Sequence, residues 1–340
     1  QALLRLLVEQ ARLDTENGIN SRGLVSGYPG SPLGGFDLEL TRNKDRLKAA
    51  GIVFQPAINE ELAATAIWGS QHIHLYDQPE IDGVFGLWYG KGPGLDRALD
   101  ALRHANMGGV AKQGGMVLAV GDDPTGKSST IAYQSEQTLI AAGIPFFYPR
   151  AVNEIIPMGL QAFALSRFAG CCVGIKIVVD TADASAIVDM GAIRPTLNLP
   201  QDAGQVHIGR HDPALLREAT LFNLRLPAVR AFQEKNLINA PIEPQPGNAK
   251  PENRKLGIIA VGKSLFEVND ALISLGINDI DKAGIGLFPI TMPWPLNQQH
   301  IADFITRYDE VMIVEEKRPI VEEQIARIIV NLPDRAIITG

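Results

Sequence analysis

Two acidic residues open a segment whose pattern predicts a helix over residues 59–70. Glu60 and Glu61 lie in its first turn, where the helix dipole favours a carboxylate and Asn59 can cap the helix. Apolar residues follow Glu60 at three, four, seven and eight positions, so its side chain points toward the apolar stripe of the helix. Either residue could instead be a solvated or capping acid. Because Glu60 faces the stripe, it is the candidate for acid–base chemistry.

A glycine- and proline-rich turn, GYPGSPLGG over Gly27–Gly35, follows a predicted strand over 23–27. Its four glycines and two prolines fix a backbone that a ligand can approach closely. In open parallel sheets, ligands bind beyond the carboxyl ends of the strands, where this turn is expected to lie. Ser31 and Tyr28 are its only side chains able to hydrogen-bond a substrate. A plain strand-to-helix turn is the alternative interpretation.

A second glycine-rich strand end lies within GLWYGKGPGLDR, residues 86–97. It follows a predicted strand over 83–89 and leads into a helix that we expect to begin near Asp96. Such a segment can line a cofactor site, although glycine patterns alone are weak evidence. Its candidate residues are Gly90, Lys91, Gly92 and Gly94.

The segment GDDPTGKS at Gly121–Ser128 matches the nucleotide-binding pattern GxxxxGK(S/T) and follows a predicted strand. A P-loop turns its backbone N–H groups onto a polyphosphate, and here Asp122 and Asp123 would add two negative charges beside that ligand. A P-loop also leads directly into its helix, whereas here the next helix is expected to begin only near Ser135. Nucleotide hydrolysis is therefore an alternative that the acidic loop disfavours.

Composition narrows the class of protein. The 340 residues are 46% apolar and 20% charged, as in ordinary globular domains, and the formal net charge is -7 at pH 7. This acidic balance argues against a nucleic-acid surface. No apolar run approaches the length of a membrane span and no signal peptide opens the chain, so we expect a soluble cytoplasmic protein without a membrane partner.

The cysteines and histidines predict no metal site in this chain. Cys171 and Cys172 are adjacent, and neighbouring Cα atoms about 3.8 Å apart are too close for ordinary disulfide geometry. An iron–sulfur cluster usually needs four cysteine ligands, so this chain cannot hold one by itself. The histidine pairs at 72 and 74 and at 207 and 211 lack the cysteines or acids that would complete a metal site.

The order of predicted elements indicates two α/β domains. Apolar strands alternate with amphipathic helices over residues 1–190, which predicts an open, mainly parallel sheet covered on both faces. Residues 191–254 lose this alternation and end in a proline-rich, linker-like stretch. Regular βα alternation resumes over residues 255–340 and predicts a second, smaller domain with the same kind of sheet.

Together these segments resemble the thiamine half of the thiamine-diphosphate-dependent 2-oxoacid:ferredoxin oxidoreductases, of the indolepyruvate:ferredoxin type. The order and spacing of short motifs carry the resemblance, which covers most of the chain outside 191–254. GYPGSP resembles the Y-P-x-S/T-P turn of that superfamily, and NEELAATAIWGSQ resembles its N-E-x-x-A segment. YGKGPGLD resembles its K-x-x-G-L/V-N/D loop, and DDPTGKSS resembles the D-D-P-x-x-x-S-S segment of the indolepyruvate branch. VMIVEEKRPIVEEQI at 311–325 is similar to the transketolase C-terminal-type domain that follows in this family.

The resemblance implies a thiamine-diphosphate-binding fold of the pyrimidine type over 1–190 and a transketolase C-terminal-like domain over 255–340. It implies that Glu60 hydrogen-bonds the aminopyrimidine ring and promotes the tautomer that activates the cofactor. It further implies that Ser31 and Lys91 contact the substrate. The residues implied to line the cofactor are Gly30, Glu60, Gly92 and Gly94.

By the same resemblance, the enzyme decarboxylates an aryl 2-oxo acid oxidatively, forms acyl-CoA and passes electrons to ferredoxin. The G-D-G sequence that holds the diphosphate and Mg²⁺ in such enzymes does not occur here. We therefore expect a partner domain or subunit to bind that end of the cofactor and to carry any iron–sulfur clusters, in a homo- or hetero-oligomer. A non-catalytic paralogue that only scaffolds a partner is a further alternative, against which the intact Glu60 argues.

Overall fold

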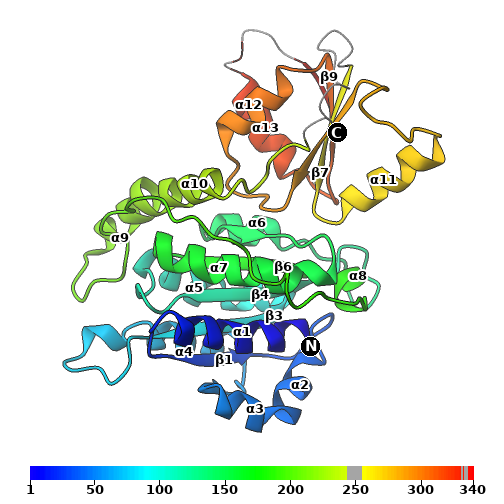
Figure 1. Ribbon diagram of the computed structural model, residues 1–340. Helices are drawn as coiled ribbons and strands as arrows, with labels where there is room; N and C mark the ends of the chain where they lie inside the picture. Colours follow the sequence, from blue (N-terminus) through cyan, green and yellow to red (C-terminus); the bar gives the residue numbers. More distant parts are fainter. Residues whose placement is uncertain (243–254, 331, 333–335) are drawn as a thin grey trace. The chain divides into compact units, whose positions relative to one another are not determined.

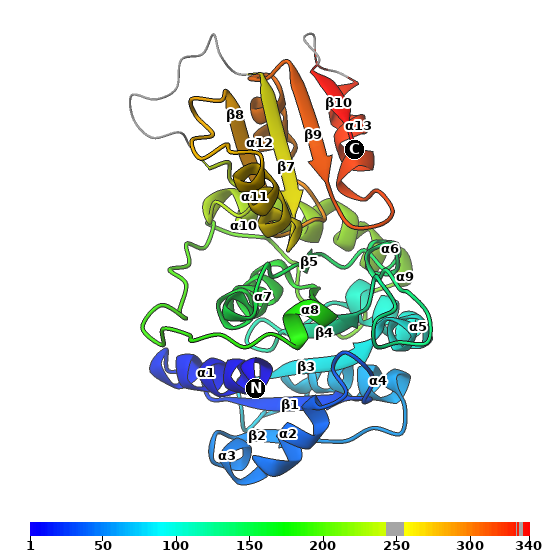
Figure 2. The ribbon, with the colours of Figure 1, turned by 90° about the vertical axis from the view of Figure 1, so that its right-hand side faces the viewer.

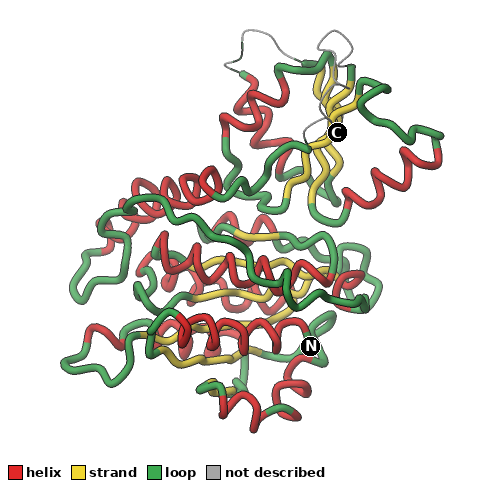
Figure 3. The backbone as a smooth tube through the Cα atoms, viewed as in Figure 1, coloured by secondary structure: helices red, strands yellow, loops and turns green. Residues whose placement is uncertain are grey.

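The computed structural model describes residues 1–242, 255–330, 332 and 336–340, and it divides the chain into two compact units. They comprise Gln1–Phe232 and Gln233–Gly340, and each is described by itself (Figure 1). In both units helices and strands alternate along the chain (Figure 3). The described helices include none that is long and apolar enough to cross a membrane.

The first unit contains a six-stranded sheet in the order β2-β1-β3-β4-β6-β5 with all neighbouring strands parallel. Every residue of β4 and β6 is buried, as expected when helices cover both faces of a parallel sheet. The predicted parallel α/β fold is confirmed. The strands are β1 (Ser21–Gly27), β2 (Ile52–Phe54), β3 (Gly83–Lys91), β4 (Met116–Asp122), β5 (Phe146–Phe147) and β6 (Cys172–Val178).

Helices form a layer on each face of this sheet. Figure 2 shows α1 (Ala2–Glu16) and α7 (Ile155–Ala169) on one side and α4 (Glu60–Ser70) and α5 (Gly92–Gly108) on the other. Within each layer the two helices pack against each other. Shorter helices fill the connections: α2 (Phe36–Arg42), α3 (Lys44–Ala49), η1 (Ile73–Leu75), α6 (Glu136–Ala141), η2 (Val152–Glu154) and α8 (Val179–Ala182).

Two predicted helices differ from the structure. The single helix expected over 36–50 is divided at Asn43 into α2 and α3. The helix expected from Asp96 instead begins at Gly92, directly after β3 ends at Lys91. Proline is tolerated in the first turn of a helix, where its missing N–H would have no intrahelical partner, so Pro93 does not delay this start.

The predicted connector over 191–254 contains regular structure and is shared between the units. Its described part includes α9 (Ala214–Thr220), the π-helical segment η3 (Leu221–Arg225) and α10 (Leu226–Lys235). The boundary between the compact units falls after Phe232. Most of the linker-like stretch, residues 243–254, lies outside the described residues.

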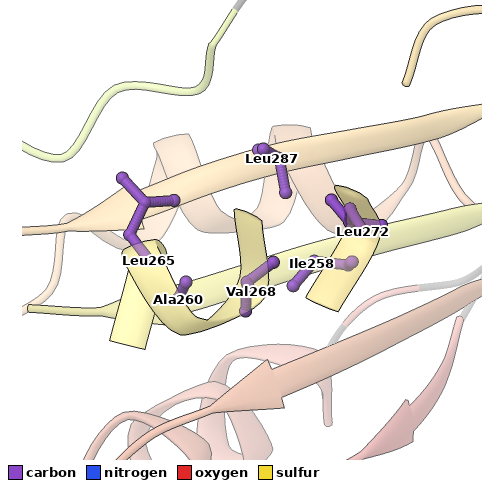
Figure 4. Packing of buried hydrophobic residues seen from close by; sticks show 6 residues of the cluster. All are labelled: Ile258, Ala260, Leu265, Val268, Leu272 and Leu287. Carbon is purple, nitrogen blue, oxygen red and sulfur yellow. The ribbon is translucent and has the colours of Figure 1, made fainter. Parts of the chain in front are cut away.

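The second unit contains a four-stranded parallel sheet in the order β10-β9-β7-β8, which confirms the second predicted α/β domain fold. One part of its core lies between α11 and the neighbouring strands β7 and β8, where Ile258, Leu265 and Leu287 are buried together (Figure 4). Its elements are β7 (Leu256–Val261), α11 (Ser264–Ser274), β8 (Ile285–Ile290), α12 (Gln298–Ile305), β9 (Glu310–Val314), α13 (Val321–Ile329) and β10 (Ile337–Thr339).

A buried arginine anchors the end of α5. The side chain of Arg225, only 1% exposed, donates hydrogen bonds to the backbone carbonyls of Asn106, Met107 and Gly108. A fourth bond runs to the carbonyl of Val206. The last carbonyls of a helix have no intrahelical donors, and a cation there also complements the helix dipole. Arg225 therefore fixes the helix whose first turn reaches the candidate site.

We expect Arg225→Met to lower the free energy of unfolding by about 3 kcal/mol, because it leaves buried carbonyls without donors. Urea unfolding followed by circular dichroism measures the loss. Arg46→Met, at an exposed position in α3, is the matched control and should change stability by less than about 0.5 kcal/mol. Similar small losses for both variants would contradict the anchoring role.

Candidate functional site

The carboxyl ends of three adjacent strands meet at one edge of the first sheet. In the parallel register, Gly27 of β1 lies opposite Tyr89 of β3, and Lys91 of β3 lies opposite Gly121 of β4. The segments that follow these strands are therefore neighbours at this edge. They are the turn over 28–35, the first turn of α5 and the loop over 123–135.

Glu60 is buried at the start of α4, on the helix face that packs into the unit. It is 5% exposed, whereas Glu61 is exposed. The Asn59 side chain caps the helix by accepting a hydrogen bond from the backbone N–H of Leu62 at 2.8 Å. The indole N–H of Trp88 donates to the backbone carbonyl of Glu60 at 2.9 Å. The inward orientation predicted for Glu60 is confirmed, and its backbone carbonyl is held by Trp88.

The carboxylate of Glu60 lies directly against Gly94 in the first turn of α5. A Cβ atom at Gly94 would lie 2.5 Å from Oε1 of Glu60, so this approach requires glycine. A helix N-terminus favours an anion at this point. Among the residues that the structure describes, no group donates a hydrogen bond to this carboxylate. Glu60 is thus buried, close to a helix N-terminus and available to a ligand.

The structure also brings the other predicted substrate residues to this edge. The aliphatic chain of Lys91 lies against Gly30, where an added Cβ would be 2.8 Å from Cδ of the lysine. The hydroxyl of Ser31 hydrogen-bonds the hydroxyl of Ser128, with 2.5 Å between the two Oγ atoms. Ser31 and Lys91 are both partly exposed and can therefore be reached from solvent.

Gly92 faces a side chain that the sequence did not single out. An added Cβ at Gly92 would collide with the ring of Tyr133, whose hydroxyl interacts with Asp96 and Thr138. Burial, together with the acceptor Asp96, raises the pKa of Tyr133 well above its ordinary range. The tyrosine ring therefore occupies the space beside Gly92, and Gly94 is the glycine that meets Glu60.

The loop that matches the nucleotide-binding pattern has another organisation. The carboxylate of Asp123 accepts hydrogen bonds from the backbone N–H groups of Lys127, Ser128 and Ser129 at 2.9, 2.7 and 2.7 Å. In a P-loop these donors would point at a polyphosphate. The next helix, α6, begins only at Glu136, as expected. Because Asp123 already occupies these donors, the loop does not form a phosphate cradle and the nucleotide-hydrolysis alternative does not fit.

Beneath this loop lies a buried cluster of charges. Lys176 of β6 is fully buried, with its ammonium 2.5 Å from Oε1 of Glu136 and 3.6 Å from Oδ2 of Asp122. Burial, opposed by the Lys176 ammonium, raises the pKa of Asp122 from 3.8 to about 6. Lys176 is the least expected of these residues, and its only signal in the sequence is a lysine within an apolar strand pattern.

The raised pKa of Asp122 predicts a pH dependence of stability. A group whose pKa is higher in the folded state stabilises the fold below its ordinary pKa and loses this contribution as the pH rises through its folded value. Between about pH 4 and pH 7 the wild type should therefore lose up to about 3 kcal/mol relative to Asp122→Asn. Urea midpoints over this range measure the difference, with Asp45→Asn at an exposed position as control. A wild type that gains stability over this range relative to Asp122→Asn contradicts the prediction.

Comparisons with known proteins find similar sequences and a similar fold. A family model described as an indolepyruvate oxidoreductase domain matches residues 248–340. The indolepyruvate oxidoreductase subunit IorA of Pyrococcus abyssi is 27% identical over 317 residues, covering 89% of this chain and 44% of the relative. That of Thermococcus kodakarensis is 28% identical over 316 residues, covering 89% and 44%. The chain therefore spans less than half the length of these relatives.

Two solved structures share the fold across both units. The 2-oxoglutarate:ferredoxin oxidoreductase from Magnetococcus marinus superposes with a TM-score of 0.63 at 15% identity, covering 98% of this chain and 61% of that one. A split-gene transketolase, solved as an inactive β4 tetramer, has a TM-score of 0.58 at 13% identity and covers 99% and 86%.

The chain thus shares its fold with a 2-oxoacid:ferredoxin oxidoreductase and is similar in sequence to indolepyruvate oxidoreductase subunits. Within these matches, residues 248–340 are similar to the indolepyruvate oxidoreductase domain, and 89% of the chain aligns with IorA subunits at 27–28% identity.

Proposed function

We propose that this chain supplies the aminopyrimidine half of a thiamine diphosphate site in a 2-oxo acid oxidoreductase. One observation carries the proposal: the carboxylate of Glu60 is buried at the carboxyl edge of the sheet and has no hydrogen-bond partner among the described residues. A largely shielded carboxylate that receives no donor from its own chain is available to a ligand that supplies one. An aminopyrimidine ring, flat and rich in nitrogen donors and acceptors, fits that requirement.

In this proposal Glu60 exchanges a proton with a ring nitrogen of the cofactor. Trp88 holds its backbone carbonyl and Asn59 caps its helix at Leu62, so the carboxyl stays in one place while its proton moves. Gly94 permits the close approach of this carboxylate to the first turn of α5. Thiamine diphosphate, when bound, supplies the electron sink for loss of CO₂ from a 2-oxo acid.

Ser31 and Lys91 are proposed to bind the carboxylate of the 2-oxo acid. A hydroxyl donor and an ammonium at one edge suit a carboxylate, because hydrogen bonds to a charged acceptor are stronger than neutral ones. Gly30 keeps the turn close enough for the Lys91 chain to lie along it. Gly92 leaves room for the ring of Tyr133, and we propose that this ring closes one side of the site.

The remaining parts of the reaction are proposed to lie outside these residues. We propose that a partner domain or subunit binds the diphosphate and Mg²⁺, carries iron–sulfur clusters and passes electrons to ferredoxin, with an aryl-acyl-CoA as product. Within the described part of the chain, no group of three His, Cys, Asp or Glu is placed to hold a metal. Cys171 and Cys172 are fully buried, and burial raises the pKa of the Cys171 thiol to about 12, which disfavours the thiolate needed for ligation.

The domain roles follow the same proposal. We assign the aminopyrimidine half to residues 1–190, which contain Glu60, Gly94, Ser31 and Lys91. Residues 255–340, within which most of the family match lies, are assigned to the transketolase C-terminal-like domain. Residues 191–254 connect the two in this assignment.

Glu60→Gln in the complete enzyme tests the proposal most directly. Glutamine keeps the size of the side chain but holds no exchangeable carboxyl proton, so turnover should fall roughly 10²–10⁴-fold while folding is intact. Steady-state oxidation of the 2-oxo acid measures the loss, and circular dichroism checks the fold. The exposed Glu61→Gln is the matched control and should keep its activity within a few-fold. An indifferent Glu60, or equal losses at both positions, would favour the non-catalytic scaffold.

Gly94→Ala tests the geometry separately from the ionisation. The new Cβ occupies the place of the Glu60 carboxylate and should displace it, so activity should fall about tenfold or more although the acid is retained. Gly69→Ala in α4 is the control, because an added Cβ there meets no atom within 4 Å. It should leave activity unchanged and stabilise the helix by about 0.5–1 kcal/mol. Full activity in Gly94→Ala shows that the contact is dispensable.

A further inference from the structure

The fully buried Lys176 joins the two ends of the loop over 123–135. Its ammonium lies 2.5 Å from Oε1 of Glu136, the first residue of α6, and 3.6 Å from Oδ2 of Asp122, the last residue of β4. It also lies 4.4 Å from the ring centroid of Tyr148. Burying an ammonium is costly unless it is paired, so these contacts hold both carboxylates in place.

Asp122 passes this constraint to the backbone of the loop. Its Oδ1 accepts from the N–H of Asp123 at 3.1 Å and its Oδ2 accepts from the N–H of Ser135 at 2.9 Å. The first and the last residue of the loop are therefore bonded to one carboxylate. Within the described part of the chain, the second oxygen of Glu136 has no hydrogen-bond partner. Lys176 is therefore the group that fixes this side chain.

The loop held in this way reaches the candidate site at two points. Ser128 bonds to Ser31, and the ring of Tyr133 lies on Gly92. Asp123 fixes the interior of the loop through the backbone of residues 127–129. Glu60 is held independently, by Asn59 and Trp88. A displacement of the loop therefore moves the substrate side of the site and leaves the acid in place.

We infer that Lys176 is a positioning residue of the candidate site, clamping the loop that presents Ser128 to Ser31 and Tyr133 to Gly92. The inference rests on the proposed function for its effect on catalysis, but the clamp itself can be tested without it. Because Glu60 is held separately, loss of the clamp should raise KM for the 2-oxo acid about tenfold, the change that about 1.4 kcal/mol produces, and change kcat less than about threefold.

Two variants separate the clamp from charge compensation. Lys176→Met removes the ammonium and leaves two buried carboxylates unpaired, so it also lowers stability. Lys176→Met/Glu136→Gln removes one charge of each sign, and should regain most of that stability without restoring the ammonium that holds the Asp122 and Glu136 side chains in place. Lys282→Met, at an exposed position in the second unit, is the control.

Limited trypsin digestion of the complete enzyme reports the loop directly, because Lys127 lies within it and is exposed. Cleavage after Lys127, identified by mass spectrometry, should accelerate about tenfold in both Lys176 variants, while cleavage after Lys48 in α3 keeps its rate. This result, together with the raised KM and nearly constant kcat of the double variant, supports the inference.

Three outcomes overturn it. Wild-type cleavage after Lys127 in the double variant shows that no clamp exists, whatever the function of the site. Equal acceleration at Lys48 and Lys127 shows general destabilisation. Accelerated cleavage with an unchanged KM shows a clamp that does not position the site. The proposed function fails separately, through an indifferent Glu60→Gln.

Discussion

The parallel register of β1, β3 and β4 is the constraint on which the candidate site depends. Because the three strands run in the same direction, their carboxyl ends open at one edge, and segments distant in sequence become neighbours there. Ser31 meets Ser128 across 97 positions of sequence for this reason. The helices contribute at the same edge, since α5 begins directly after β3 and brings Gly94 under Glu60.

The sequence predicted the strands and the orientation of Glu60 well, because both depend on simple periodicity. Buried parallel strands are continuous apolar runs, and the helical spacing after Glu60 shows which acid faces inward. The start of α5 was predicted four residues late, at Asp96. Glycine and proline usually mark loops, but here close packing against Glu60 and Tyr133 requires Gly92 and Gly94 within the helix itself.

Contacts between loops could not be predicted from local patterns. The spacing of Gly121–Ser128 suits a phosphate loop, and only the structure shows that Asp123 occupies the donors. The adjacent Asp122 and Asp123 have different partners because β4 ends between them. Asp122 completes β4 and meets Lys176 of the neighbouring β6, whereas Asp123 turns into the loop. The buried pairing of Lys176 with Glu136 likewise joins residues 40 positions apart.

The contrast between Asp123 and Glu60 indicates where a ligand would bind. Both carboxylates are buried at the same edge of the sheet, 1% and 5% exposed. Asp123 accepts hydrogen bonds from three backbone groups and one hydroxyl, so it needs nothing further. The Glu60 carboxylate accepts none within the part of the chain that the structure describes, although its backbone is tightly held. An acid that is held in place without a donor from its own chain is available to a bound donor, which is why the ligand is expected at Glu60 and not at Asp123.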